Sequence, residues 1–563
     1  MRRVTATDRF KDGGRPLGQG GADRSLVEPW IDDPVAPQTA ASRASECHLG
    51  RGADMDLDNY RSLEIRREDL PSGSDPGDGP VESQLITTVP NDMLADNGRG
   101  AMYGWVGLDI GTTSSKAVVY DDTGQSLGSS RRSTVWHQDA DGTEIDANQL
   151  RDGAIDTLAE AVQRLPRSIT IAGVGITSMG ETGVLVDHAG RPIAPAIAWH
   201  DRRDDVEVAE LRRDLGADAF AVQAGKPLRG QFSITKHRWL TRHDSQVASA
   251  VRRFNVAEWV ALGLGADEAC DRSLACRTGW FDISANRWWD EALSWSGASA
   301  TLMPPLVQSG EAIGRVTADR APYALSGAVV ALAGHDHQAA ALGVGALLPG
   351  DELDSSGTAE ALVRSILPEL GPTQLLDLAR AGITTDLSIQ PHRWSLLGGT
   401  EGGLAMRRVL DLLGVTDTGL ADLDRQALAT TSGRITVYGI GTAGLCVEGI
   451  GDRVGPGDLW RAVVETATAQ AVRLHDAMSA VTGPHNRIIA TGGWCHSAMV
   501  MRAKHEGFGD VLVASASEAG TLGAATIAAR AAGHLDPHDI LGQGTCSPRV
   551  TALAPRSSRM PAR

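Results

Sequence analysis

The sequence of 563 residues contains no long apolar run and no excess of basic residues. A membrane-spanning helix needs about 20 consecutive, mainly apolar residues, and no segment approaches that length. The first residues also lack the apolar stretch of a secretory signal. The formal net charge is -17 at pH 7, whereas binding to a nucleic-acid backbone requires a basic face. We therefore expect neither a membrane nor a nucleic acid as a partner.

Paired cysteines are missing as well. The six cysteines are scattered and form no C-x-x-C pair: Cys47, Cys270, Cys276, Cys446, Cys495 and Cys546. Neither a zinc site nor a disulfide framework is indicated, so a reducing compartment is expected and the cytoplasm is the predicted location. The hydrophobic share of 42% and the charged share of 22% are typical of a soluble globular protein. The length predicts about two to four domains.

The two ends of the chain differ in composition from the rest. Residues 1–101 are rich in Arg, Asp, Gly, Ser and Pro, and little there repeats at helical or strand spacing. Burial could therefore hardly offset the entropy cost of ordering this segment. Two explanations remain open, a disordered leader and a translation start assigned upstream of a true start near Met102, and we favour the second. The basic segment 546–563 is predicted to be a flexible tail.

The segment 105–120 is the most informative part of the chain. An apolar run ends at Asp109, passes through the small residues Gly111, Thr112 and Thr113, and enters a second apolar run. This pattern predicts a β-hairpin whose turn exposes backbone N–H groups and hydroxyls beside one carboxylate. A polyphosphate can approach such a turn because Gly111 has no Cβ, and Asp109 is suited to hydrated Mg²⁺. An ordinary hairpin with small turn residues fits the pattern equally well.

From residue 103 to about 542 the chain alternates predicted strands and helices. A buried apolar run at 328–335 leads into Asp336, and a helix of small residues is predicted at 337–345. Asp336 is therefore expected where a strand gives way to a helix, whose N-terminus would help to keep it ionised.

A second group of turn residues follows in the same half of the chain. The segment 352–363 again carries acids, hydroxyls and glycine between apolar stretches, with Gly357 and Thr358 in its turn. A later strand runs into Gly492 and Gly493. Two halves that each offer a phosphate-type turn predict a duplicated α/β fold with a nucleotide held between them.

In this order the elements resemble the FGGY carbohydrate kinases, the family of glycerol kinase and xylulokinase within the actin-like ATPase fold. The matching segments are 107–116, 173–182, 198–203, 232–240, 271–279, 334–338, 355–358, Gly492-Gly493 and 518–525. The resemblance implies an α/β fold of two actin-like, RNase H-like domains, at 103–326 and 327–545, with an ATP and sugar cleft between them.

The resemblance also implies roles for individual residues. Asp336 would be the catalytic base, and Asp109 would hold Mg²⁺. The residues implied in ATP binding are Asp109, Gly111, Thr112, Thr113, Gly357, Thr358, Gly492 and Gly493. The residues implied in substrate binding are Glu181, Trp199, Asp201, Arg203 and His337. ATP and Mg²⁺ are the implied cofactors.

Less specific interpretations of these residues stay open. Asp336 could simply cap a helix, because Asp is favoured at that position. Glu181 could be a solvated hairpin carboxylate, and His337 a satisfied core residue. Asp201 and Arg203 could form an ion pair that fixes their loop instead of contacting a sugar.

The chain departs from the family pattern in places. Gly180 stands where glycerol kinase has an arginine, which would leave more room and favours a substrate larger than glycerol. Segments 437–444 and 502–507 also differ from the usual pattern. We predict an ATP-dependent kinase for a hydroxyl, preferably a primary one, of a ketose, a pentulose-like sugar or a sugar alcohol. An actin-like ATPase that drives partner binding and a pseudokinase are the alternatives, and a homodimer is a possible state.

Overall fold

The computed structural model describes residues 102–139, 142–319, 321–431, 433, 435–442, 444–516, 518–542 and 550–552. The predictions for residues 1–101 and for most of the tail 546–563 lie outside these residues. None of the helices in the described part is long and apolar enough to cross a membrane.

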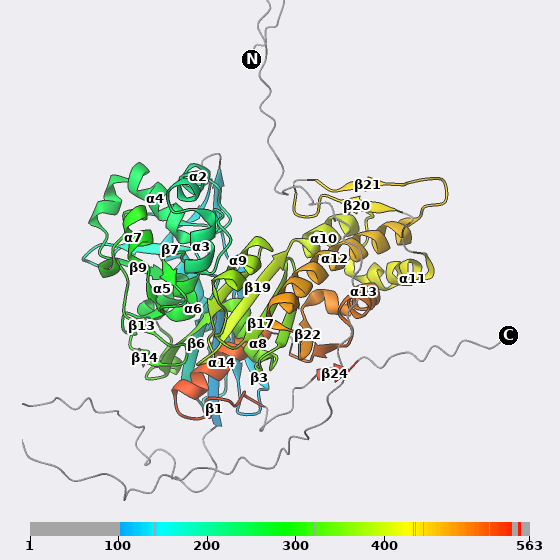
Figure 1. Cartoon of the computed structure of the whole chain (residues 1–563). Coiled ribbons are helices and arrows are strands. Elements are labelled where there is room, and N and C mark those ends of the chain that lie inside the picture. The colour runs from blue at the N-terminus through cyan, green and yellow to red at the C-terminus, as the bar shows by residue number, and fades with distance from the viewer. Residues whose placement is uncertain are drawn as a thin grey trace, which may run out of the picture. The chain divides into compact units, whose positions relative to one another are not determined.

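The first sheet has the order β14-β15-β6-β1-β2-β3 (Figure 1). Its strands are β1 (Met102–Ile110), β2 (Ser114–Tyr120), β3 (Ser126–Ser133), β6 (Ile169–Ser178), β14 (Ala312–Arg315) and β15 (Val329–His335). β1, β6 and β15 are parallel to one another, and β2 pairs antiparallel with β1. The hairpin predicted at 105–120 is therefore confirmed.

The second sheet has the order β18-β19-β17-β16-β22-β23-β24. Its strands are β16 (Asp351–Ser356), β17 (Glu360–Ile366), β18 (Thr384–Leu387), β19 (Trp394–Thr400), β22 (Arg487–Thr491), β23 (Val511–Ala514) and β24 (Val550–Ala552). β24 pairs antiparallel with β23. Residues 550–552 of the segment predicted to be a flexible tail thus form a strand of this sheet.

The remaining elements connect and cover the two sheets. The helices are α1 (Ala147–Gln163), α2 (Asp205–Asp214), α3 (Ala217–Ala224), α4 (Ser233–His243), α5 (Val256–Gly263), α6 (Arg272–Cys276), α7 (Asp290–Ser296), α8 (Asp336–Gly343), α9 (Pro372–Arg380), α10 (Gly402–Leu412), α11 (Leu420–Ala429), α12 (Pro456–Thr482), α13 (Ala498–Phe508) and α14 (Ala519–Ala531). Short 3₁₀ helices are η2 (Ser245–Ser249), η3 (Ala300–Leu302), η4 (Tyr323–Leu325), η5 (Asp417–Gly419) and η6 (Gly493–His496). The small-sheet strands are β4 (His137–Asp139), β5 (Gly142–Ile145), β7 (Gly183–Val186), β8 (Ala196–Ile197), β9 (Arg252–Asn255), β10 (Cys270–Asp271), β11 (Phe281–Asp282), β12 (Arg287–Trp288), β13 (Leu306–Val307), β20 (Thr436–Tyr438) and β21 (Cys446–Glu448).

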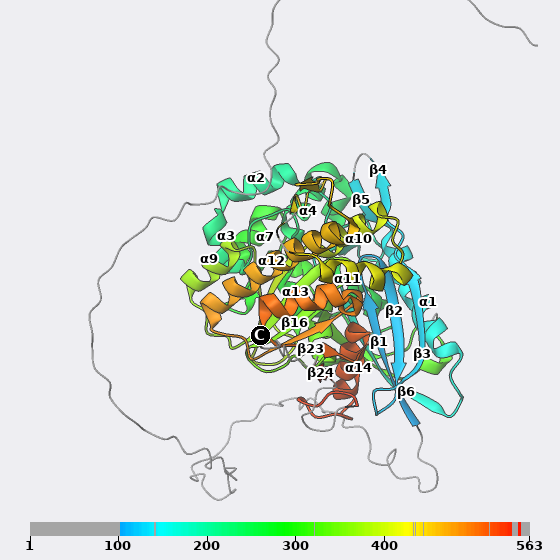
Figure 2. The same ribbon diagram turned by 90° about the vertical axis from the view of Figure 1, so that its right-hand side faces the viewer.

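The two faces of β1 pack against different helices, because side chains alternate along a strand. Val106 and Leu108 belong to a core that includes residues of α1 and α5, whereas Trp105 packs with residues of α14. Figure 2 shows α1 and α14 on either side of the blue strands. A Cβ at Gly107 would lie 1.8 Å from the Thr521 carbonyl oxygen, so α14 can contact the sheet this closely only at glycine. The strand thus directs Asp109, on the same face as Gly107, toward the start of α14.

A side chain caps the start of α1. Asp146 accepts a hydrogen bond from the backbone N–H of Gln149, as expected for an N-cap residue. In the second sheet, α12 contacts β17 and β19, and α8 contacts β16 and β17. α8 also packs against α14, which itself lies on β1, β6 and β15. The late helix α14 therefore packs on the first sheet.

The first sheet extends further along the sequence than the predicted domain boundary at 326/327. β15 pairs in parallel with β6, so it is part of the first sheet. The five tryptophans between residues 239 and 289 divide into two groups. Trp259 and Trp280 are fully buried, whereas Trp239, Trp288 and Trp289 keep part of their surface exposed.

Candidate active site

Three acidic side chains follow the same edge of the first sheet. Asp109 lies near the end of β1, Glu181 follows β6 shortly after its end, and Asp336 follows β15 directly. The three strands are parallel neighbours in the order β15-β6-β1, so their carboxyl ends share one edge. In open α/β sheets, ligands bind outside this edge. The fold therefore brings together the predicted metal ligand, substrate ligand and base.

Asp109 and Asp336 have strongly perturbed pKa values. Burial raises the pKa of Asp109 to about 7, and the charge of Asp336 adds to this shift. Burial also raises the pKa of Asp336 to about 7, although the backbone N–H of His337 donates to its Oδ1 at 2.6 Å. The helix N-terminus does favour the ionised Asp336, as expected, but burial outweighs that effect. Two interacting carboxylates of this kind mark a functional site.

Two histidines flank Asp336, and both are neutral at pH 7. Burial lowers the pKa of His337 to about 4 and that of His335 well below its ordinary value. His335 Nε2 lies 3.4 Å from Asp336 Oδ1, and the ring centroids of the two histidines are 5.5 Å apart. A neutral His337 next to the carboxylate is compatible with the predicted contact to a substrate hydroxyl.

The β1–β2 turn is held by two tryptophans. Trp136 Nε1 donates to the Thr112 carbonyl at 2.7 Å, and Trp199 Nε1 donates to Thr112 Oγ1 at 2.8 Å. Thr112 Oγ1 itself contacts Met179 Sδ at 3.7 Å. Within the described residues, the backbone N–H groups of Thr112 and Thr113 have no hydrogen-bond acceptor. The Thr112 hydroxyl thus holds Trp199, and the two unpaired N–H groups of the turn are of the kind that can bind an anion.

The second turn, residues 356–359, follows the corresponding edge of the second sheet. β16 and β22 are parallel neighbours in register at their carboxyl ends, so Gly357 and Gly492 follow adjacent strand ends. The turn is closed by a hydrogen bond from Gly357 N to Ala359 O at 3.1 Å. Trp494 Nε1 donates to the Gly357 carbonyl at 2.9 Å. Both sheets thus present a glycine turn held by a tryptophan N–H.

Three glycines shape the surroundings of this second turn. Gly492 has φ 103°, and a Cβ there would lie 2.3 Å from Ser356 O, so only glycine fits. A Cβ at Gly493 would meet no heavy atom within 4 Å, which leaves open space for a ligand. Gly403 was not predicted as a site residue from the sequence, and a Cβ at this position would lie 2.0 Å from Gly357 O. The sequence feature that could have indicated this close contact is the glycine pair Gly402-Gly403, which lies where β19 gives way to α10.

Glu181 has an unusual backbone and a buried side chain. Its φ of 65° lies in the left-handed region, which non-glycine residues adopt rarely and often at functional sites. Its Oε1 accepts hydrogen bonds from Gln231 Nε2 at 2.9 Å and from Arg277 Nε at 2.9 Å. The side chain is only 3% exposed, which argues against a solvated hairpin carboxylate. No described residue donates to Oε2, which is therefore available for a substrate hydroxyl.

Arg277 was not predicted as a site residue, although its segment contributes to the family resemblance. It pairs with Glu181 and, through Nη1 at 3.1 Å, with Asp386 Oδ2 of β18. Lys226 Nζ lies 2.7 Å from the other oxygen of Asp386. All four side chains are at most 3% exposed. This chain of ion pairs connects the substrate side of the first domain to the second sheet.

The loop after β8 carries the other predicted substrate residues. Trp199 is half-buried, and its indole N–H donates to Thr112 in the β1–β2 turn. Asp201 accepts from Arg203 Nε at 3.0 Å and from backbone N–H groups of Thr143 and Arg203. Arg203 Nη1 donates to Glu144 Oε2 at 2.8 Å. These contacts favour the alternative in which Asp201 and Arg203 fix the loop against β5, and no hydrogen bond connects them to Glu181.

The space beside Gly180 is already filled. A Cβ at this position would lie 3.0 Å from the Cβ and Cγ atoms of Arg277 and 3.2 Å from His335 Cδ2. The expectation of extra room for a larger substrate is therefore not met. The side chain of Arg277 takes part of the volume that an arginine at position 180 would need.

Asp109 is suited to a magnesium ion. Mg²⁺ usually keeps several waters and needs only one or two protein carboxylates beside phosphate oxygens. The raised pKa of Asp109 reflects a buried charge that a cation would stabilise. Lys116 Nζ is paired with Glu518 at 2.9 Å and does not compete for this role. Within the described residues there is no cluster of three or more side chains that could hold a metal alone.

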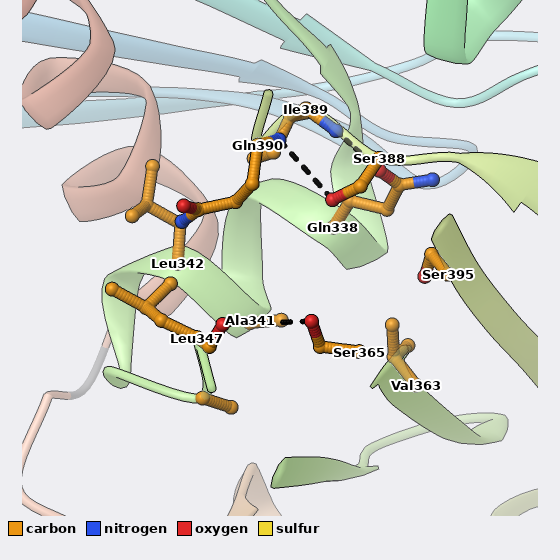
Figure 3. A pocket seen from close by; sticks show the side chains of 11 residues that line it. Gln338, Ala341, Leu342, Leu347, Val363, Ser365, Ser388, Ile389, Gln390 and Ser395 are labelled. Atoms are coloured by element: carbon orange, nitrogen blue, oxygen red, sulfur yellow. Dashed lines mark hydrogen bonds between the residues drawn. The ribbon is translucent and has the colours of Figure 1, made fainter. Parts of the chain in front are cut away.

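A small cavity of about 20 Å³ lies beside α8 (Figure 3). It has room for about one water molecule, so it is not a sugar site. Gln338, in its wall, accepts from Ile389 N at 2.9 Å and donates to Leu387 O at 3.2 Å. These bonds fix the first turn of α8, which begins with Asp336, to β18.

Comparisons with known proteins agree with this geometry. The models of the FGGY family of carbohydrate kinases match with their N-terminal domain at residues 104–343 and their C-terminal domain at residues 427–532. The glycerol kinase of Rhizorhabdus wittichii is 28% identical over 464 residues, which cover 76% of this chain and 88% of that protein. The glycerol kinase of Nocardia farcinica is 33% identical over 262 residues, which cover 45% of this chain and 51% of that protein.

Solved structures show the same fold. The xylulose kinase of Rhodospirillum rubrum superposes with a TM-score of 0.68 at 24% identity, covering 78% of this chain and 92% of that one. The Plasmodium falciparum glycerol kinase with ADP gives a TM-score of 0.70 at 19% identity, covering 78% and 92%. The expected fold of two actin-like, RNase H-like domains is confirmed. The chain belongs to the FGGY family of carbohydrate kinases.

Proposed function

We propose that the protein transfers the γ-phosphoryl group of ATP, with Mg²⁺, to a hydroxyl of a sugar or polyol. The strongest support is the placement of Asp109, Glu181 and Asp336 after three adjacent parallel strands. Phosphoryl transfer requires mainly positioning and charge stabilisation. One carboxylate for a metal, one for the substrate and one for the transferred proton meet this requirement.

Asp336 is the proposed general base. The acceptor oxygen forms a bond to the γ-phosphorus while the bond from that phosphorus to the bridging oxygen of ADP breaks, and the hydroxyl proton passes to Asp336. A base works best when its pKa lies near the working pH, and burial raises the pKa of Asp336 to about 7. Gln338 keeps this carboxylate in place by anchoring α8 to β18.

Glu181 is the proposed acceptor of hydrogen bonds from the substrate. Arg277 and Gln231 bind its Oε1, so Oε2 faces the substrate hydroxyls in this proposal. His337, directly after the base, is the second proposed substrate contact. The fixed geometry of Glu181 would select hydroxyls at one distance from the reacting oxygen.

The two glycine turns are the proposed phosphate sites. The N–H groups of Thr112 and Thr113 would bind from the first sheet, and Gly357 and Thr358 from the second. Gly492 and Gly493 would border the adenosine. Mg²⁺ held at Asp109 would neutralise charge that develops on the transferred group.

A cytoplasmic setting is part of the proposal. The four cysteines in the described part of the chain are free: Cys270, Cys276, Cys446 and Cys495. Free thiols and a requirement for ATP support a reducing compartment.

The test measures ADP release with a panel of ketoses, aldoses and polyols, for the wild type and for Asp336→Asn. We expect acceptor-dependent turnover that falls about 10²- to 10⁴-fold in the variant. Asp417→Asn is the matched control, because that side chain is 84% exposed, and it should retain full turnover. ATP binding without turnover on any acceptor would favour a pseudokinase, and acceptor-independent hydrolysis that survives in Asp336→Asn would favour a partner-driven ATPase.

A further inference from the structure

Five charged side chains lie near the proposed substrate side of the first domain, and four of them are joined in ion pairs. Arg277 pairs with both Glu181 and Asp386, and Lys226 pairs with Asp386. Arg229 lies on the same connection between α3 and α4 as Lys226, and it has no acidic partner among the described residues. Arg229 is therefore the one cation among these five side chains that forms no ion pair in the described part of the chain.

Arg229 is also short of hydrogen bonds. Its one hydrogen bond to a described residue runs from Nη2 to the carbonyl of Gly382, at 3.2 Å. Its Nε is buried without any acceptor, and a buried donor left without a partner is unfavourable by about 1–3 kcal/mol. Burial and the charge of Arg277 lower its pKa to about 10, so the guanidinium still carries its charge at pH 7.

A second arginine in this region, by contrast, has several hydrogen-bond acceptors. Arg253 is fully buried and also lacks an ion pair among the described residues. Its guanidinium, however, donates to Asn255 Oδ1 at 2.6 Å, to Ser233 Oγ at 2.8 Å and to the Glu181 carbonyl at 3.1 Å. Arg229 has no such set, and part of its side chain stays exposed.

Arg229 lies close to the proposed substrate. Gln231, only two residues later, donates to Glu181 Oε1 at 2.9 Å. The charges of Glu181 and Arg277 both act on the guanidinium of Arg229. A ligand that reaches Oε2 of Glu181 with one hydroxyl can therefore extend toward Arg229 with its other end.

We infer that the hydroxyl-bearing acceptor carries a carboxylate group, which pairs with Arg229 while another part of the molecule binds Glu181. A guanidinium presents a planar fork of N–H donors that matches a carboxylate. A single guanidinium without an ion pair suits a monoanion, whereas a phosphate dianion would need a second free cation, and Lys226 and Arg277 are already paired. The substrate class is then a polyhydroxy acid, and this inference rests on the kinase activity proposed above.

The experiment compares acids with the neutral polyols of equal length. The acceptors are glycerate, erythronate, xylonate and gluconate beside glycerol, erythritol, xylitol and glucitol, with ADP release as the readout. For the wild type we expect at least one acid to exceed its neutral counterpart in kcat/KM by about 10- to 100-fold, the range of a charge-assisted hydrogen bond. In Arg229→Gln, the KM for that acid should rise by a similar factor, while the kcat/KM for neutral polyols stays within about twofold.

Two further variants make the result specific. Arg229→Lys keeps the charge but loses the planar fork, so it should retain part of the preference for the acid. Arg380→Gln is the matched control, because Arg380 is 61% exposed and pairs with an exposed acid on the surface, and it should leave the preference unchanged. As a readout independent of turnover, the preferred acid should raise the Tm of the wild type and not that of Arg229→Gln.

The outcomes separate the two proposals. A neutral polyol or ketose that is phosphorylated better than every acid, with an equal preference in Arg229→Gln and Arg229→Lys, would overturn the inference and leave the kinase proposal intact. If no acceptor of either kind is phosphorylated but an acid raises the Tm through Arg229, the binding inference stands and the kinase proposal fails. Equal Tm shifts in the wild type and in Arg229→Gln would overturn the inference in either case.

Discussion

Replacing Arg277 by methionine should destabilise the protein strongly and in a way that depends on Glu181. The guanidinium is 2% exposed and is the cation paired with Glu181, which is 3% exposed. Loss of one partner of a buried ion pair leaves the other charge uncompensated and lowers the free energy of unfolding by about 3–5 kcal/mol. We expect the lower end, because Lys226 continues to pair with Asp386.

A double variant separates the ion pair from simple packing. In Arg277→Met with Glu181→Gln, the orphaned carboxylate is gone and Gln231 can still bind the amide. The combined loss should therefore be smaller than the sum of the single losses by about 1–3 kcal/mol. The assay is urea unfolding followed by tryptophan fluorescence, with the first transition analysed, because multi-domain proteins often unfold in more than one step.

The control for this cycle is Arg380→Met. Arg380 is 61% exposed and pairs with Asp218, which is 67% exposed, so its loss should change the free energy of unfolding by less than about 1 kcal/mol. Equal losses for Arg277→Met and Arg380→Met, or additive losses in the double variant, would refute the argument that Glu181 depends on Arg277.

Three further predictions concern the surroundings of the turn at residues 356–359 and the proposed base, Asp336. Lys504→Met removes the buried cation that pairs with Asp354 and Glu360, so the free energy of unfolding should fall by about 3–5 kcal/mol. Because burial raises the pKa of Asp354 to about 7, the protonated acid stabilises the fold below this value and that contribution disappears as the pH rises through it. The loss in Lys504→Met, measured by urea unfolding, should therefore be larger at pH 8 than at pH 6, and an equal loss at both would contradict the assignment. Gly492→Ala would place a Cβ against the preceding turn at φ 103°, so the KM for ATP should rise at least about tenfold, and an unchanged KM would remove Gly492 from the nucleotide site. The kcat/KM of the wild type should increase with pH through about 7 as Asp336 loses its proton, whereas the residual activity of Asp336→Asn should show no such step.

Local patterns predicted the parts of the fold that repeat along the sequence. The hairpin around Asp109, the strand before Asp336 and the turn at Gly492 all depend on an apolar run followed by small or acidic residues, which a single segment can show. The structure places each of these elements at the carboxyl end of a parallel strand. The family resemblance then supplied their expected roles.

Contacts between distant segments could not be predicted in this way. Arg277 and Asp386 are 109 positions apart, and no sequence pattern in either segment indicates that the two residues pair. The expectation of free space at Gly180 failed for the same reason, because the side chain that fills this space comes from Arg277. Trp199 was expected to bind the substrate, and nothing in its own segment indicated that its indole N–H donates to the hydroxyl of Thr112.

The first sheet extends past the predicted domain boundary at 326/327 for a related reason. The run at 328–335 resembles the start of a second unit, because an apolar strand leads into an acid there. β15 instead joins β6 of the first sheet, a pairing between segments about 150 residues apart that depends on the register of the whole sheet.

The most direct test of the central claim follows the γ-phosphoryl group itself. Radiolabelled ATP is incubated with the wild type and with Asp336→Asn, and the label is located in the acceptor or in inorganic phosphate. The account predicts that the wild type places the label in the acceptor and that the variant loses this transfer by about 10²- to 10⁴-fold. Label that enters inorganic phosphate at the same rate with and without an acceptor, in both proteins, would contradict it.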